Sequence, residues 1–523
     1  MSQHQTTPPL GLATQAEEMD GTGGEGLAST QVRGSSLLLA GRFIALVVDF
    51  AAQVLLVRYL AKGDYGTVAW ALAIVSLGSS LAVFGLDKTL SRFLPLYEER
   101  RDAGRMFGSI AIAVAAVLLI GTATVLLFRG GSTWLTGTLG TDDRTFSVLL
   151  VLIVLAPVQA LDSLLIAISA ALSSPRSILF RRYIIAPALQ LAVVSYVVLV
   201  AGDVTQLAIG YVAAGALGVA IYVPVLVRLF KRRQIAAGLQ LRQLRFPVRE
   251  LFGYSLPLLW SDLVFVMRGS LVVVLIEYLR GTSEVASFRA VLPMARMNLV
   301  VLQSFAFLFL PLASRMFARA DGAGLAKVYW TSATWVTVLS LPIFLVSFSL
   351  ADPVVDLLYG ARYEDSTVIQ ALLALGFFVH GALGVSGLTL RAVGRVRYLF
   401  TVDVVTAVSS IVLTLVLIDS HGALGAAVAT AATLVAQSLL YSWGLRGSEI
   451  HLEPAFVTLF VVVIAVAVGL IVLQAVTAAP LAIGVALAVA VSFLIFRWQR
   501  PRLRILAMFP ELERLPLIAR FLA

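Results

Sequence analysis

The sequence predicts an all-α polytopic membrane protein with about fourteen transmembrane helices, arranged as two six-helix bundles followed by two further helices. Hydrophobic residues make up 59% of its 523 residues and charged residues only 13%, a balance typical of membrane proteins rather than water-soluble domains. Apolar runs of about 20 residues, the length that crosses a bilayer, recur along the chain between Gly, Pro and charged residues. An internal repeat groups these runs into two halves.

The repeat is visible in matching residues at the ends of the expected helices. Tyr59 and Tyr278, each followed by Leu, lie 219 residues apart, and Arg176 and Arg395 show the same offset. Each copy holds six spans. Because six is even, both copies face the same way in the membrane, as parallel repeats with a cargo site between them.

The expected segments follow in chain order. The tail 1–31 is polar and lacks the apolar core of a signal peptide, so we expect it to be disordered. The linker 231–249 is basic and amphipathic, and the tail 499–523 is similar in character, which suits a membrane surface. The bundles are expected over 32–230 and 250–446, and the last two helices over 447–498. The individual spans are expected at 34–57, 66–93, 107–128, 147–171, 178–201, 205–229, 251–279, 286–313, 328–350, 366–390, 397–418, 422–444, 455–477 and 479–497.

Lys and Arg concentrate in alternate loops, which predicts the orientation of the chain. Loops such as 95–106 and 173–182 are basic, as are the linker and the C-terminal tail, whereas the opposite loops carry few basic residues. Basic loops stay in the cytoplasm, so both termini are predicted to lie on the cytoplasmic side of the cytoplasmic membrane. The net charge of +10 would indicate nucleic acid in a soluble protein, but here the basic residues at helix ends favour anionic lipids as partners.

No signature of an enzyme stands out. The chain has no Cys and only four His, which excludes a Cys nucleophile, a Cys metal site and disulfides. The longest expected outer loop, 129–146, is too short for a catalytic domain. A group of acidic residues resembles a catalytic loop, but we interpret it as a solvated surface (Asp352, Asp356, Glu364 and Asp365). We therefore predict no catalytic residues, no metal and no cofactor.

Charged residues lie inside the expected spans of the first half. Arg42 and Asp49 are seven residues apart and share a helix face, while Asp87 and Lys88 come near the depth of Arg42 from the next span. One interpretation is an Arg42–Asp87 ion pair that locks two helices together. The other is a cavity-lining group that contacts cargo or a coupling cation.

Three arginines lie inside the spans between 251 and 315, where a charge costs on the order of 3 kcal/mol or more. Arg289 and Arg296 share a helix face, and Arg268 is expected at a similar depth. The planar guanidinium binds two oxygens at once, so arginine suits phosphate. We therefore predict an anionic cargo bound by these residues, with Arg42 from the first half and a hydrogen bond from Asn298. The alternative is structural: Arg289 reaches the outer membrane surface and Arg268 pairs with Glu277.

Further polar residues in the second half indicate possible energy coupling. His380 and Asp403 lie in neighbouring expected spans, where they either couple to protons or Na⁺ or pack as hydrogen-bonded core residues. Three prolines in the spans between 251 and 315 are candidate hinges (Pro257, Pro293 and Pro311).

Three motifs occur in order along the chain: residues 58–66 (RYLAKGDYG) after the first span, 357–366 (LLYGARYEDS) before the tenth, and 387–397 (GLTLRAVGRVR) at the next turn. Together they resemble the polysaccharide and O-antigen flippases of the multidrug/oligosaccharidyl-lipid/polysaccharide exporter superfamily. The resemblance covers about 32–500. The chain departs from the family pattern at Ala61, where Gly is usual, and in its long N-terminal tail.

The resemblance implies a fold of two six-helix bundles forming a V that opens alternately to each side of the membrane. It implies a polyprenyl-(pyro)phosphate-linked glycan as cargo, moved from the inner to the outer leaflet for glycan biosynthesis, with other glycan-assembly membrane proteins as possible partners. A lipid II flippase and a cation-coupled multidrug antiporter of the same superfamily are alternatives. A polytopic glycan polymerase or ligase is a third alternative and would be an enzyme.

Overall fold

The computed structural model describes residues 41–131, 142–172, 179–232, 243–447, 450–477 and 479–503, and every regular element within them is helical. Twelve of the described helices are long and apolar enough to cross a membrane. One of the twelve, α18 (Val396–Trp443), contains the non-helical Gly422 and supplies two of the expected spans. With the described helix 41–59, these helices correspond to the fourteen expected positions and confirm the predicted fold class.

The first half contains helix 41–59 and the elements that follow it up to Arg232. They are α2 (Lys62–Val83), α3 (Leu86–Glu99), α4 (Ala103–Gly130), α6 (Asp143–Leu152), α7 (Leu155–Ala171), the π-helix Leu179–Ile185, α9 (Ala186–Leu199) and α10 (Val204–Arg232). The single span expected at 66–93 is broken at Phe84 and Gly85, whose φ angles are 53° and 68°. A side chain at Gly85 would approach Ser255 O within 2.8 Å, so the close approach of α11 requires glycine there.

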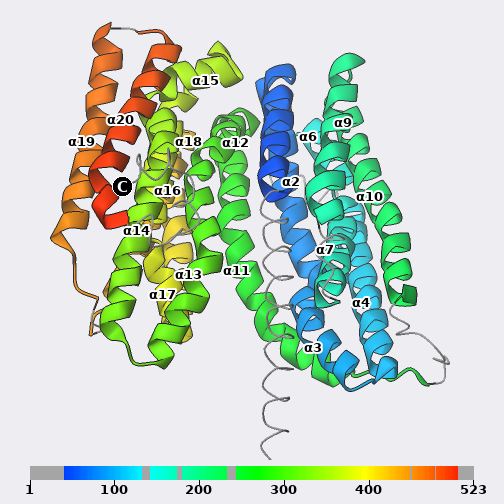
Figure 1. Cartoon of the computed structure of the whole chain (residues 1–523). Coiled ribbons are helices and arrows are strands. Elements are labelled where there is room, and N and C mark those ends of the chain that lie inside the picture. The colour runs from blue at the N-terminus through cyan, green and yellow to red at the C-terminus, as the bar shows by residue number, and fades with distance from the viewer. Residues whose placement is uncertain are drawn as a thin grey trace, which may run out of the picture.

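The second half runs from Val248 to Trp443, and two more helices follow it. Its elements are α11 (Val248–Arg280), α12 (Thr282–Arg296), the 3₁₀ segment Met297–Leu299, α13 (Val300–Ala318), α14 (Gly322–Phe344), the π-helix Leu345–Ser349, α15 (Ala351–Tyr359), the 3₁₀ turn Ala361–Tyr363, α16 (Ser366–Leu383), α17 (Val385–Ala392) and α18. The helices α19 (Pro454–Thr477) and α20 (Leu481–Leu503) lie along the outside of this half beside α14 (Figure 1).

Local chemistry explains two interruptions in the second half. Within α18, Arg280 Nε donates to Ile418 O at 3.1 Å, and Ala423 N donates to Glu284 Oε2 at 2.6 Å. These contacts satisfy backbone groups that a helix end leaves unpaired, so the chain turns at Gly422. The 3₁₀ segment after α12 follows Pro293, one of the three predicted hinge prolines.

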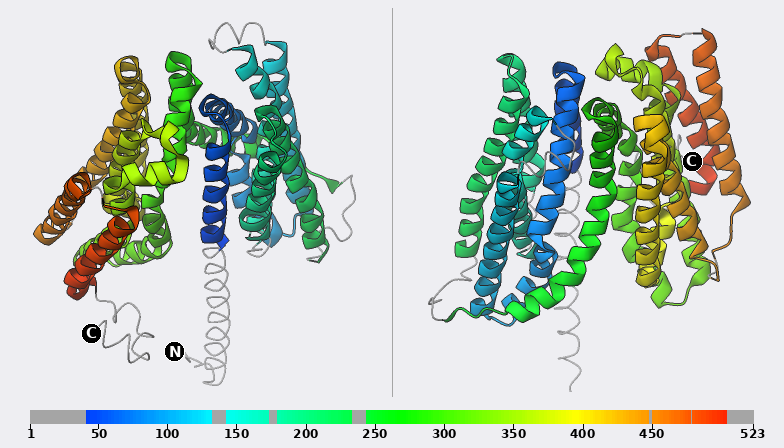
Figure 2. Two further views of the ribbon diagram at one scale, coloured as in Figure 1. Left: turned by 90° about the horizontal axis from the view of Figure 1, so that it is seen from above. Right: turned by 180° about the vertical axis from the view of Figure 1, so that it is seen from behind.

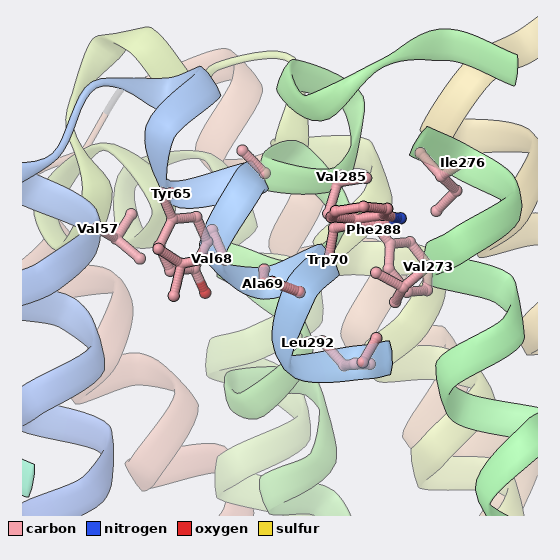
Figure 3. Close-up of a cluster of buried hydrophobic side chains, with 14 of the residues drawn as sticks. Val57, Tyr65, Val68, Ala69, Trp70, Val273, Ile276, Val285, Phe288 and Leu292 are labelled. Carbon is pink, nitrogen blue, oxygen red and sulfur yellow. The ribbon is translucent and has the colours of Figure 1, made fainter. Parts of the chain in front are cut away.

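One hydrophobic core joins the two halves near one end of the molecule. In Figure 3, Trp70 of α2 lies among Phe288 and Val285 of α12 and Val273 of α11. Of two other large cores, one lies in the second half and includes α19 and α20, and the other lies in the first half and takes in Leu251 at the start of α11. The halves are therefore separate bodies that share a packed contact.

Helix α11 connects the two halves in a way that the sequence did not predict. Its first turns pack against α3 of the first half, where the Arg92 guanidinium lies 4.5 Å from the centre of the Tyr254 ring. Its later turns pack against α18, so that α11 runs diagonally from one half to the other (Figure 2). The tail 1–31, most of the expected linker and the tail after Leu503 lie outside the described residues.

Candidate functional site

Two arginines connect the halves by reciprocal contacts with backbone carbonyls. Arg58 Nε donates to Leu358 O at 2.9 Å, and Arg362 Nη2 donates to Val57 O at 3.0 Å. Each arginine belongs to one of the sequence motifs of the family resemblance. The first two motifs, far apart in the sequence, therefore form a single contact.

Further contacts between the halves surround these arginines. Lys62 Nζ lies 2.7 Å from Asp365 Oδ2, which also accepts a 2.8 Å hydrogen bond from Ser287 Oγ. A side chain at Gly66 would collide with Thr282 O, so the first turns of α2 and α12 touch through their backbones. We call this region, residues 57–66, 282–290 and 357–365, the closed end.

A cavity of about 610 Å³ lies between the halves beside the closed end. Helix 41–59, α2, α9 and α10 line one side, and α12 and α13 line the other. Gln53 Nε2 donates to Ala290 O at 3.1 Å near the closed end, whereas Arg42 donates to Gln303 farther along. These two positions are about 16 Å apart along the first helix, at 1.5 Å per residue. The volume of this interface cavity is typical of a small-molecule site.

Positive charge dominates the interface cavity. Four of its arginines face a single acid, Asp49 (Arg42, Arg182, Arg289 and Arg296). Arg289 and Arg296 share a face of α12, as predicted. Within the described part of the chain, none of the four forms an ion pair with a carboxylate. An arginine without a carboxylate partner is costly inside a membrane, so this arrangement is matched to an anionic ligand.

The structure adds residues that sequence reasoning missed. Arg182 was placed in a loop, but it lines the interface cavity beside Tyr183. Gln53, Gln190 and Gln303 also line it, each from an apolar helix. A search for uncharged polar side chains inside apolar spans would have found the three glutamines.

A second cavity of about 540 Å³ holds Arg268 together with both predicted coupling residues, His380 and Asp403. Arg268 Nη1 donates to Gln437 Oε1 at 2.7 Å, and Gln437 Nε2 donates to Asp403 Oδ1 at 2.6 Å. Tyr441 completes the group through its hydroxyl, which donates to the same oxygen of Asp403. We call this the second-half cavity, because α11, α16 and α18 supply most of its lining.

Two pairings that the sequence offered as alternatives are not formed. Arg42 does not pair with Asp87, because its guanidinium donates to Gln303 across the interface cavity. Arg268 does not pair with Glu277; it belongs to the Gln437 network and faces a different cavity from Arg289.

Three other predicted site residues lie away from the interface cavity. Asn298 is fully buried, and its amide nitrogen donates to Ala295 O at 3.0 Å and to Ser347 Oγ at 3.1 Å. These hydrogen bonds are made within the protein, which gives Asn298 a structural role. Lys88 forms an ion pair with Asp262 across the two halves. Asp87 lines two further polar cavities beside α3 and α7. The structure therefore brings Arg42, Asp49, Arg289 and Arg296 together in the interface cavity, and it gathers a second set in the second-half cavity (Arg268, His380, Asp403 and Lys88).

Comparison with known families identifies the chain at this point. A family model described as polysaccharide biosynthesis protein matches residues 55–368, more than half of the chain. The chain belongs to the polysaccharide biosynthesis protein family. This membership confirms the resemblance carried by the motifs, two of which form the closed end.

Individual relatives are distant. The chain is 22% identical over 194 residues to the probable low-salt glycan biosynthesis flippase of Haloferax volcanii, a match over 37% of this chain and 41% of that protein. It therefore spans less than half the length of this curated relative. Among solved structures, the lipid II flippase MurJ in an inward closed conformation superimposes with a TM-score of 0.67 at 13% identity, over 90% of this chain and 100% of that one. An inward-facing multidrug resistance MATE transporter of the MOP superfamily gives 0.66 at 13% identity, over 76% and 93%. These likenesses establish a shared fold for this family member.

Proposed function

We propose that this protein is a flippase that moves a polyprenyl-(pyro)phosphate-linked oligosaccharide across the cytoplasmic membrane by alternating access. The observation that carries the proposal is the set of four arginines in the interface cavity, which have no carboxylate partner among the described residues. Arginine is the side chain best suited to phosphate oxygens. The family membership and the name of the Haloferax relative support the same function.

In this proposal the phosphate groups bind Arg289 and Arg296 on α12, and Arg42 and Arg182 bind from the first half. The sugars occupy the rest of the interface cavity, and the lipid tail leaves sideways into the bilayer. Arg268, which faces the second-half cavity, serves the hydrogen-bond network of that cavity rather than the cargo.

The proposed orientation places the closed end on the outer side of the membrane and both termini in the cytoplasm, because the basic loops lie on the opposite side from the closed end. The structure is then a state that is closed to the outside. Energy would come from a proton or Na⁺ gradient, with Asp403 and His380 as the coupling residues, and no cofactor is involved.

Three alternatives differ in the charge or chemistry they require. Lipid II also carries a glycan on a polyprenyl pyrophosphate, so a lipid II flippase fits the arginines equally well and is distinguished only by its glycan. A multidrug antiporter with cationic cargo is disfavoured, because four arginines face one acid. A polymerase needs available acidic residues in an outer loop, and one of those proposed, Asp365, is already bonded to Lys62 and Ser287.

The decisive experiment measures the binding of a polyprenyl-pyrophosphate oligosaccharide to purified protein in detergent. Arg296→Ala should weaken binding by about 1.5–3 kcal/mol, roughly tenfold or more, because a charge-assisted hydrogen bond is lost. Arg319→Ala is the matched control, since Arg319 is exposed beyond the end of α13 and outside both cavities. Equal affinity of wild type and Arg296→Ala, or binding of organic cations instead, would reject the proposal.

A further inference from the structure

The interface cavity has a second kind of lining besides its arginines. Its first-half side includes, beside Arg42 and Arg182, four uncharged polar side chains: Gln53 from helix 41–59, Tyr65 from α2, Gln190 from α9 and Tyr211 from α10. We call them the amide–tyrosine wall. We infer that this wall is a binding subsite for the sugar attached directly to the phosphate of a lipid-linked glycan. The inference rests on the proposed function and adds a sugar specificity to it.

The chemistry of the wall matches a sugar better than a phosphate or a lipid tail. A carboxamide offers both a donor and an acceptor, and a tyrosine adds a hydroxyl that can do either, as sugar hydroxyl groups require. The tyrosine ring also has an apolar face beside its polar tip, which suits a pyranose with C–H faces and hydroxyl edges. None of the four side chains carries the positive charge that a phosphate favours, and an isoprenoid chain would leave their polar groups unpaired.

The geometry places the wall directly against the arginine helix. Gln53 Nε2 donates to Ala290 O at 3.1 Å and approaches Arg289 O at 3.4 Å, while it also contacts the Tyr65 hydroxyl at 3.2 Å. A phosphate on the side chain of Arg289 would therefore have the wall beside it. Because the first sugar is bonded directly to that phosphate, it is the sugar that reaches the wall.

The four members of the wall differ in how the protein uses them. The amide nitrogen of Gln53 already bonds the second half, so Gln53 also helps to hold the closed end together. Gln190 is exposed to the cavity, and its side chain lies within hydrogen-bonding reach of the hydroxyl group of Tyr211, a half-buried residue. Gln190 and Tyr211 both belong to the first half and make no hydrogen bond to the second half among the described residues, so they can be changed without loosening the contact between halves.

The test compares two probes: polyprenyl pyrophosphate alone, and the same lipid carrying one N-acetylglucosamine. Binding of each to full-length purified protein is measured for wild type, Gln190→Ala, Tyr211→Phe and Arg296→Ala. Tyr196→Phe is the matched control, because Tyr196 lies on the same helix as Gln190 but outside the cavity. Thermal unfolding of each variant shows that it is folded.

We expect Gln190→Ala and Tyr211→Phe each to weaken binding of the sugar-bearing lipid about threefold to tenfold, as the loss of one or two neutral hydrogen bonds predicts, and to leave the bare lipid unchanged. Arg296→Ala should weaken binding of both probes. If wild type binds both probes equally, or if the wall variants change both probes or neither, the sugar subsite is rejected while the flippase proposal stands. If wild type binds neither probe, or Arg296→Ala changes nothing, the flippase proposal fails and the subsite fails with it.

Discussion

The two cavities of this protein contain the same kind of charged residue in opposite settings. In the second-half cavity, Arg268 is bonded to Gln437, which in turn is bonded to Asp403, so an acid belongs to the same hydrogen-bond network. In the interface cavity, Arg289 and Arg296 have no such partner among the described residues. Removing one member of a buried network of bonded polar groups destabilises the fold, whereas an unpaired charge in the membrane interior is itself costly and gains energy when an anion binds it.

The cavities also differ in what forms their walls. The interface cavity has one wall from each half, so its shape must change if the halves rock against each other. Apart from Lys88, the second-half cavity is lined by a single half and keeps its shape in such a motion. Cargo binding is therefore expected where the walls separate, and a stable network where they do not.

The largest expected effect comes from fixing the walls of the interface cavity together. A Cβ added at Gly63 would lie 3.8 Å from Ser283 Oγ, so the two positions are neighbours and Gly63→Cys with Ser283→Cys should cross-link the closed end under oxidant. The chain has no other cysteine. Transport of a lipid-linked glycan into the outer leaflet of proteoliposomes should stop and return on reduction. Each single-cysteine variant is the control, and undiminished transport by the cross-linked protein would show that the closed end does not open.

The next prediction distinguishes the two cavities by whether replacing their arginines raises or lowers the stability of the protein. The double variant Arg289→Ala/Arg296→Ala should bind polyprenyl pyrophosphate at least about a hundredfold more weakly, since two charge-assisted contacts of about 1.5–3 kcal/mol each are lost. Its thermal stability without ligand should stay the same or rise, because two unpaired like charges leave the membrane interior. A fall in the unfolding temperature without ligand would mean that these arginines are structural and that the contrast between the cavities is false.

Arg268→Ala should give the opposite result. The change leaves the buried Gln437 without its charged donor, so the free energy of unfolding should fall by about 1.5–3 kcal/mol. The affinity for polyprenyl pyrophosphate should not change. Arg391→Ala is the control, because Arg391 lines the same cavity but is exposed. Calorimetry and the binding assay are carried out on the same preparations. Weaker binding of polyprenyl pyrophosphate at unchanged stability would show that Arg268 belongs to the cargo site.

The fold was predictable because each span is long and apolar, and no tertiary contact is needed to recognise it. The sequence could not show features that depend on tertiary contacts. One is the turn at Gly85, where α11 approaches; the other is the packing of the start of α11 on the first half. Gly85 alone does not mark a break, because α4 continues through Gly108 and Gly121.

The candidate site was predictable only in part, for a similar reason. Arg289 and Arg296 were placed on one face because seven residues make about two helical turns. The partner of Arg268 was missed because Gln437 is 169 residues away and is uncharged, so no charge pattern marks it. Sequence spacing fixes relations within a helix, whereas the division of the arginines between two cavities depends on how separate helices pack.

The smallest expected effect tests whether exposed charge helps to keep the interface cavity closed. Lys62 and Asp365 form an ion pair across the halves, but their side chains are 22% and 51% exposed, and such pairs contribute only about 0.2–1 kcal/mol. In the Gly63→Cys/Ser283→Cys background, adding Lys62→Ala should therefore slow disulfide formation by less than about fivefold, and salt should reduce the difference. Adding Asp365→Ala should slow it more, because the hydrogen bond from Ser287 is lost as well. If Lys62→Ala alone abolished cross-linking, the ion pair rather than the backbone contact of Gly66 with Thr282 would hold the closed end together.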